Sequence, residues 1–185
     1  MKREKEDLSV LSVATASTNR TAMSGLIVMN LVLAAAYAIE VIKDARGIGS
    51  YLVILALCLV PSALAVVLYK RKQDTLLVKY AFAIGFALLY AYIMFTTTTT
   101  LAFCYVIVAY VMLMVYKDTK LLLGLGIWAI LINIALLIKR LMSGGLTGTA
   151  ISEAEIILAC LLLTGFFSLL ALKKINGINQ ANIDK

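Results

Sequence analysis

Six long runs of apolar residues fill most of this chain, and their length restricts it to a small set of folds. Each run is close to the roughly 20 residues that an α-helix needs to cross about 30 Å of hydrocarbon. The runs do not alternate between polar and apolar residues, as the strands of a transmembrane barrel do. We therefore predict an all-α membrane protein, a bundle of six transmembrane helices. They are expected at residues 22–42, 51–69, 76–95, 98–116, 121–138 and 151–172.

The composition agrees with a location in the bilayer. Of the 185 residues, 63% are hydrophobic and 15% are charged, and the mean hydropathy is +0.99, far too apolar for an ordinary soluble domain. The first run is not expected to be a cleaved signal peptide, because the polar segment 1–21 precedes it. Pro61 lies inside the second run and is predicted to bend that helix.

The positive charges predict the orientation, because Lys and Arg are retained on the cytoplasmic side. With the amino terminus inside, thirteen of the 17 Lys and Arg residues fall on the inner side: Lys2, Arg3, Lys5, Arg20, Lys70, Arg71, Lys72, Lys79, Lys117, Lys120, Lys173, Lys174 and Lys185. The outer side has Lys43, Arg46, Lys139 and Arg140. Both termini are therefore predicted to be cytoplasmic. The net charge of +7 is explained by topology and by contact with anionic lipid, without nucleic acid.

Five consecutive threonines interrupt the apolar sequence in "FTTTTTLAFCY", residues 95–105. Without them the fourth run would cover only residues 101–116, which is short for a crossing. We predict that they lie at the outer membrane boundary, partly in helix and partly in the tight turn between the third and fourth helices. Threonine can hydrogen-bond to a carbonyl one turn back, so a polar hairpin tip is one interpretation. A row of hydroxyls lining a pocket is the other.

Other polar residues concentrate in the half of the bundle that this topology places outside, where they suggest a crevice open to that side. The inner half contributes chiefly Lys79, Tyr80 and Tyr110, and Asn30 lies near the middle. We predict a ligand-binding surface formed by Tyr37, Glu40, Asp44, Tyr90, Tyr92, Thr96, Thr97, Thr98, Thr99, Thr100, Tyr105 and Asn133.

Several of these residues also have structural explanations. Tyr37, Glu40 and Asp44 share one helix face by their spacing, but Glu40 can equally pair with Lys43 at the interface. Asn133 can bridge two helices by hydrogen bonding. Outside this set, residues 152–155 form a capping-box pattern that predicts the start of the sixth helix.

Residues for catalysis and metal binding are scarce. There is no histidine, and Cys58, Cys104 and Cys160 are isolated in separate runs without the short spacings of metal or redox sites. No phosphate-binding glycine loop occurs. We expect no enzyme activity, no metal and no cofactor. Proton-coupled transport is also disfavoured, because few acidic residues lie near the membrane midplane.

The sequence after the sixth run, "LKKINGINQANIDK", places Ile175, Ile178 and Ile183 at roughly helical spacing. This pattern favours a membrane helix that continues into a cytoplasmic helix, from which more chain would follow; a frayed basic end is the alternative. The predicted organisation is a cytoplasmic segment at 1–21, a six-helix sensor domain at 22–172 and the start of a signalling helix at 173–185.

Four stretches resemble the amino-terminal six-helix membrane region of certain bacterial methyl-accepting chemotaxis proteins. They are "IEVIKDARGIGSYLVI" (39–54), "KYAFAIGFALLYAYIMFTTTTTLAFCYVIVAY" (79–110), "INI" (132–134) and "KKINGINQANIDK" (173–185). The resemblance implies a receptor of the bacterial cytoplasmic membrane that works as a homodimer. It also implies a following coiled-coil domain that regulates a histidine kinase through a coupling protein. Similar membrane regions also precede nucleotide cyclases or kinases, so the output domain stays open.

We therefore expect a sensory domain that detects a small ligand, or a change in the membrane, and moves its sixth helix. The alternative is a substrate-binding membrane subunit of an energy-coupling-factor vitamin transporter, which also has about six helices in a chain of this length. Ala34 and Ala38, four residues apart, are similar to the contact motif of those subunits. A purely structural membrane anchor is a third possibility, and it predicts no pocket.

Overall fold

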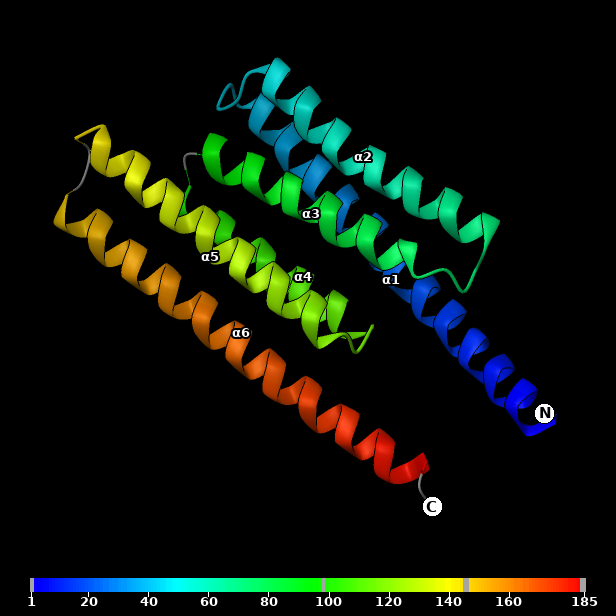
Figure 1. Cartoon of the computed structure of the whole chain (residues 1–185). Coiled ribbons are helices and arrows are strands. Elements are labelled where there is room, and N and C mark those ends of the chain that lie inside the picture. Colours follow the sequence, from blue (N-terminus) through cyan, green and yellow to red (C-terminus); the bar gives the residue numbers. More distant parts are fainter. Residues whose placement is uncertain (1, 98, 145–146, 184–185) are drawn as a thin grey trace. The chain divides into compact units, whose positions relative to one another are not determined.

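Helices make up every regular element of the computed structural model (Figure 1), which describes residues 2–97, 99–144 and 147–183. This confirms the all-α class predicted from the apolar runs. The elements are α1 (Lys2–Ile42), α2 (Ile48–Arg71), α3 (Leu77–Thr96), the 3-10 helix η1 (Thr100–Cys104), α4 (Tyr105–Met114), α5 (Thr119–Met142) and α6 (Gly148–Ile183).

Five of these helices are long and apolar enough to cross a membrane. They are α2, α3 and α5 over their whole length, Leu11–Ile42 of α1 and Gly148–Ile178 of α6. Large apolar side chains on these helices are exposed, including Val60, which is 65% exposed, and Phe167, which is 60% exposed. Lipid tails cover such side chains without the penalty that water would impose. The chain is a multi-pass helical membrane protein.

The fourth apolar run forms a shorter element than the other five, because its first residues do not join the α-helix. Thr99 precedes η1 in extended conformation, and its side chain accepts a hydrogen bond from the amide of Leu101. η1 then leads directly into α4, which has 10 residues. At about 2.0 Å per residue in η1 and 1.5 Å in α4, the two elements together reach about 25 Å.

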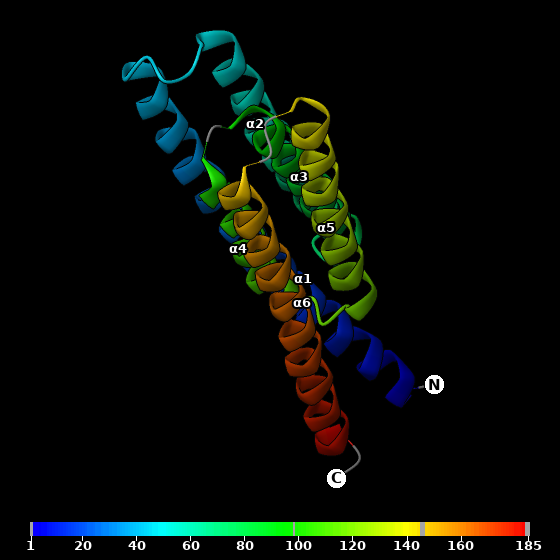
Figure 2. The same cartoon turned by 90° about the vertical axis from the view of Figure 1, so that its left-hand side faces the viewer.

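The chain forms two compact units, Met1–Leu89 and Tyr90–Lys185, and the boundary lies within α3. In the first unit, α1 and α2 pack side by side as an antiparallel hairpin (Figures 1 and 2). The two helices are joined by a Schellman motif, in which the amide of Ala45 bonds to the carbonyl of Glu40 and that of Asp44 to Val41. Asp44 takes the left-handed position of this motif, with φ 54°.

Pro61 lies within α2, and the helix continues through it. The carbonyl of Cys58, one turn earlier, accepts a hydrogen bond from Ser62 Oγ at 2.7 Å and another from Asn30 Nδ2 of α1 at 2.9 Å. On another side the proline ring lies against Gly85 of α3, where a Cβ atom would overlap it. Gly85 thus leaves room for the proline ring, and Asn30 and Ser62 bond to the backbone one turn before it, which explains how a membrane helix accommodates Pro61.

In the second unit α5 and α6 lie side by side, and α4 packs on both (Figures 1 and 2). Tyr110 of α4 is 2% exposed, and its hydroxyl fits where two neighbouring helices have no side chain. The hydroxyl lies against Gly126 of α5, and a Cβ atom at Gly165 of α6 would be 3.2 Å from it. The glycines let three helices approach closely around one large side chain, a common feature of membrane packing.

The hydrogen bonds of two asparagines mark where the longest helices pass beyond their neighbours. Asn19 of α1 donates from Nδ2 to the carbonyls of Gln73 and Thr75 in the α2–α3 connection, at 2.8 Å each. Asn176 of α6 donates to the carbonyl of Lys117 in the α4–α5 connection at 3.4 Å. Both helices continue beyond these levels, α1 back to Lys2 and α6 on to Ile183. The predicted boundaries after residues 21 and 172 thus fall inside continuous helices.

The capping-box prediction for the sixth helix is wrong. α6 begins at Gly148, so Ser152 lies inside the helix, where its Oγ donates to the carbonyl of Gly148. The capping contact comes from Thr147, whose Oγ1 accepts from the amide of Ala150 at 3.3 Å. Thr147 satisfies one of the unpaired amides at the helix start, which is the role the pattern had assigned to Ser152.

Candidate functional site

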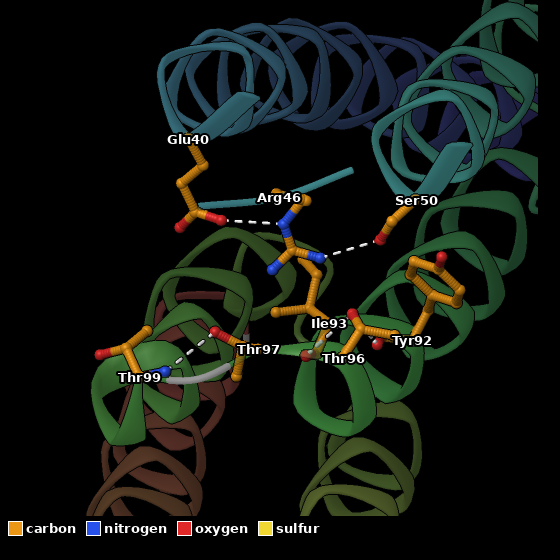
Figure 3. A network of polar contacts seen from close by, with 8 residues as sticks. All are labelled: Glu40, Arg46, Ser50, Tyr92, Ile93, Thr96, Thr97 and Thr99. Atoms are coloured by element: carbon orange, nitrogen blue, oxygen red, sulfur yellow. Dashed lines mark hydrogen bonds and ion pairs between the residues drawn. The ribbon is translucent and has the colours of Figure 1, made fainter. Parts of the chain in front are cut away.

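In the first unit, Arg46 organises the predicted polar residues at the end of α1. Its Nε donates to Glu40 Oε2 at 2.8 Å and its Nη1 to Ser50 Oγ at 3.0 Å (Figure 3). The guanidinium also lies over the ring of Tyr37, 4.6 Å from its centroid. The Arg46 side chain is 6% exposed and that of Glu40 is 37% exposed, so the guanidinium is shielded from solvent whereas the carboxylate is partly open to it.

These contacts give structural roles to Tyr37 and Glu40, two of the first three predicted ligand residues. Tyr37 is buried beneath Arg46, and Glu40 is paired with Arg46 rather than with Lys43. Asp44 lies beyond the end of α1, so it is exposed and does not share the Tyr37–Glu40 face. The cluster fastens the end of α1 to the start of α2. From the sequence Arg46 is predicted only as an outer charge, because nothing in its local pattern shows a partner six residues away.

The hydroxyls of Thr96, Thr97 and Thr99 form hydrogen bonds with the nearby backbone. Thr96 Oγ1 donates to the carbonyl of Tyr92 at 2.8 Å, as expected for threonine at a helix end. Thr97 Oγ1 accepts from the amide of Thr99 at 3.3 Å (Figure 3), and Thr99 Oγ1 accepts from Leu101 at the same distance. This arrangement fits the hairpin interpretation.

The remaining predicted residues of this region differ in their surroundings. Thr98 lies outside the described residues, and Thr100 opens η1. Tyr92 and Tyr105 are half-buried, the first in the last turns of α3 and the second at the start of α4.

Tyr90 and Asn133 form the polar centre of the second unit. Both are buried, and Asn133 Nδ2 donates to Tyr90 Oη at 2.8 Å and to the carbonyl of Ala129 at 2.8 Å. Both amide hydrogens are therefore used, whereas the Asn133 carbonyl oxygen accepts no hydrogen bond from the described residues. The bond ties the last turns of α3 to α5, as the helix-bridging alternative for Asn133 proposed. The Asn133 oxygen therefore remains available for a second role, contact with a ligand.

A cavity adjoins Asn133 between the turn after α3 and the facing sides of α5 and α6. Its volume is about 20 Å³. That is room for about one water molecule, because a water needs some 10–15 Å³. The lining residues are Met94, Thr99, Asn133, Leu136, Leu137, Arg140, Ala154, Ile157 and Leu158.

Arg140 gives this cavity its charge. It is half-buried in the last turn of α5, and its guanidinium forms no ion pair with the acidic residues that the structure describes. Arg140 and Asn133 are seven residues apart, so they share a helix face about 10 Å apart along the axis. Thr99 contributes a hydroxyl, and the other walls are apolar. A guanidinium, an amide oxygen and aliphatic walls suit a small molecule with an anionic group, a hydrogen-bond donor and an apolar body.

Of the twelve predicted ligand residues, Thr99 and Asn133 line this cavity, and Tyr90 orients Asn133. Arg140 was missed as a ligand residue, although the sequence contains the signal. An arginine two turns from an asparagine on one face of a membrane helix is unusual, because both groups are costly to bury.

No protein family, curated protein or solved structure matches this chain. Within the described ranges, His, Cys, Asp and Glu form no group that could hold a metal ion. The cysteines Cys58, Cys104 and Cys160 are all free thiols.

Proposed function

We propose that this chain is a six-span sensory region of the bacterial cytoplasmic membrane, with both termini in the cytoplasm, of the kind found in methyl-accepting chemotaxis receptors. One observation carries the proposal: α6 lines the cavity near its start and then continues without a break to Ile183. A change at the cavity therefore acts on the same rigid element that emerges at the opposite end of the unit.

The distribution of charge within each unit supports this orientation. In the second unit Asn176 contacts Lys117, so the α4–α5 connection and the basic pair Lys173 and Lys174 lie at one end. Lys139 and Arg140 end α5 at the other. In the first unit the hydrogen bond from Asn19 to Gln73 places the neighbouring Arg20 at the level of the α2–α3 connection, beside the basic end of α2. The inner charges of the positive-inside assignment are thus grouped in each unit.

A small cavity fits a sensor better than a filled and rigid core does. Because it now accommodates about one water, a metabolite can enter only if α6 moves relative to α5. The ligand then binds one arrangement more tightly than the other, which is the requirement for a ligand to shift a conformational equilibrium. We propose a small molecule with an anionic group, attracted by Arg140, as the stimulus.

The output follows from the resemblance noted for the sequence. In this proposal two copies form a homodimer, and α6 leads into a cytoplasmic signalling module. That module regulates a histidine kinase through a coupling protein. A vitamin-transport subunit would use the same cavity for substrate, but it would need no rigid continuation of its last helix.

The test varies the helical phase between α6 and an output domain. Residues 1–185 are fused to the kinase-control domain of a chemotaxis receptor, with zero to seven alanines inserted at the junction, and kinase activity is measured in membranes. We expect kinase activity to rise and fall with a period of 3.5–3.6 residues, because each added residue rotates the output by about 100°.

The control inserts one alanine after Gly144, in the α5–α6 connection, which leaves the phase between α6 and the output unchanged. The proposal is contradicted if the protein is correctly inserted into the membrane and kinase activity does not vary with the number of added alanines. Co-purification of the native chain with ATPase subunits would instead favour the transporter.

A further inference from the structure

Two grooves meet on α6 at the end opposite the cavity, outside the site described above. The first is lined by Thr119 and Leu123 of α5 together with Phe166, Leu170, Lys173 and Asn176 of α6, and its volume is about 410 Å³. The second is lined by Leu170, Lys173, Lys174, Gly177 and Ile178, with a volume of about 540 Å³. Leu170 and Lys173 belong to both, so one lysine stands where the two grooves join.

The polarity of this surface changes along the helix axis. Phe166, Leu170 and Lys173 have the spacing i, i+4 and i+7, so they form one stripe on α6. Phe166 is 56% exposed and Leu170 is 47% exposed. Lys173, about 10 Å from Phe166 along the helix axis, is exposed as well. The stripe is therefore apolar toward the middle of α6 and cationic toward its emerging end.

More positive charge surrounds the cationic end than negative charge. Lys174 follows Lys173, and Lys117 and Lys120 flank the start of α5, which the Asn176–Lys117 contact places at this end. Asp118 lies among them, but its Oδ1 caps α5 by accepting from the amides of Lys120 and Leu121 at 3.1 Å each. The local field therefore favours an anion beside Lys173.

From this arrangement we propose that the grooves bind an anionic phospholipid of the surrounding leaflet. One acyl chain lies along Leu123, Phe166 and Leu170, and the phosphate is held by Lys173. The apolar part of the surface belongs to the membrane-crossing stretch Gly148–Ile178, where lipid tails are the surrounding medium. Basic pockets between membrane helices near the cytoplasmic face are typical sites for anionic head groups.

Charge argues against a second copy of the chain as the occupant of this face. In a two-fold dimer with parallel helices, residues of an isologous contact meet their own counterparts. Lys173 and Lys174 would then face the same two lysines of the partner, and like charges across an interface are costly. A phospholipid satisfies both the apolar groove and the lysine, whereas a second α6 satisfies only the groove.

The experiment measures lipid retained by the purified full chain. The protein is extracted from vesicles containing equal amounts of phosphatidylglycerol and phosphatidylcholine, and bound lipid is counted by native mass spectrometry for wild type, Lys173→Gln and Lys70→Gln. Lys70 is the matched control, because it is an exposed lysine at the basic end of α2 and lies outside both grooves. We expect wild type to retain phosphatidylglycerol preferentially. Lys173→Gln should retain about fivefold less of it, in line with about 1 kcal/mol per lysine near anionic lipid, and Lys70→Gln should match wild type.

Three outcomes would overturn the proposal. The first is equal retention of the two lipids by wild type, and the second is equal retention of phosphatidylglycerol by Lys173→Gln and Lys70→Gln. The third is efficient disulfide cross-linking between two copies through Leu170→Cys, in a background without the native cysteines, because it would place a second copy in the groove. A Phe166→Ala variant is a second test that does not depend on the folding of Lys173→Gln. It should lose both lipids alike, since it shortens the apolar contact and leaves the charge in place. None of these readouts depends on kinase output, so the result is independent of the proposed sensory function.

Discussion

Tyr110 is the residue on which the three helices of the second unit converge. A large aromatic side chain in a membrane segment is usually interpreted as filling space, and here its hydroxyl lies against the backbone of a glycine. Gly126 is needed for this fit because any side chain would occupy the position of the hydroxyl. Gly124, two residues earlier in α5, has no neighbouring atom within 4 Å of an added Cβ. The two glycines provide a matched pair for testing the contact between Tyr110 and Gly126.

Replacing Gly126→Ala should destabilise the protein by about 1–3 kcal/mol, because overpacking a filled core forces neighbouring groups to move. Gly124→Ala should be neutral or stabilising by up to about 1 kcal/mol, since alanine is the better helix former. The measurement is unfolding in mixed micelles followed by circular dichroism. Adding Tyr110→Phe to Gly126→Ala should recover most of the loss by removing the oxygen. Equal stability of the two single alanine variants would show that the contact is unimportant.

Residue partners were the part of the site that sequence could predict least. Glu40 is predicted either to bind a ligand or to pair with Lys43, whereas its partner in the structure is Arg46, which lies beyond the Schellman turn that ends α1. Tyr90 and Asn133 were both candidates, and their hydrogen bond joins positions 43 residues apart. Spacing within one helix contains no information about such pairs, because they depend on how helices are rotated about their axes.

At the scale of elements, hydropathy located the membrane helices well and their ends poorly. The run predicted at 51–69 lies within α2, and the run at 121–138 within α5, because twenty apolar residues have no other stable state in lipid. The ends depend on capping and turns. α6 starts three residues earlier than the predicted 151, since Thr147 provides the cap, and the threonines delay the start of α4.

The pairing of α1 with α2 depends on a polar contact near Pro61. Asn30 Nδ2 donates to Ser62 Oγ at 2.9 Å as well as to the Cys58 carbonyl. We expect Asn30→Ala to cost about 0.6 kcal/mol, the average for hydrogen bonds between membrane helices, and at most about 1.7 kcal/mol. Ser24→Ala is the control, an exposed serine on the same helix. A double-mutant cycle with Ser62→Ala should show coupling of similar size. If Asn30→Ala unfolds like Ser24→Ala, the contact contributes nothing to the hairpin.

For the whole molecule, the proposed six spans can be tested by the side on which each connection lies. Cysteines are introduced singly at Lys43, Lys72, Lys117 and Ser143 after Cys58, Cys104 and Cys160 are replaced. A membrane-impermeant maleimide applied to intact cells should label Lys43→Cys and Ser143→Cys. Lys72→Cys and Lys117→Cys should react only after permeabilisation. Lys117 is the decisive position, because it follows α4 directly, and labelling there from outside would mean that the short α4 does not cross.

The continuity of α6 has a mechanical consequence. At 1.5 Å per residue its 36 residues extend about 54 Å, nearly twice the thickness of the hydrocarbon layer. The cavity lies near the start of this helix, so most of its length extends away from the cavity. In the proposed receptor, a tilt of about 5° about the level of Ile157 would move the tip at Ile183, about 39 Å away along the axis, by about 3.4 Å. In the proposed sensor, a small movement beside a cavity for about one water is thus enlarged at the far end of α6.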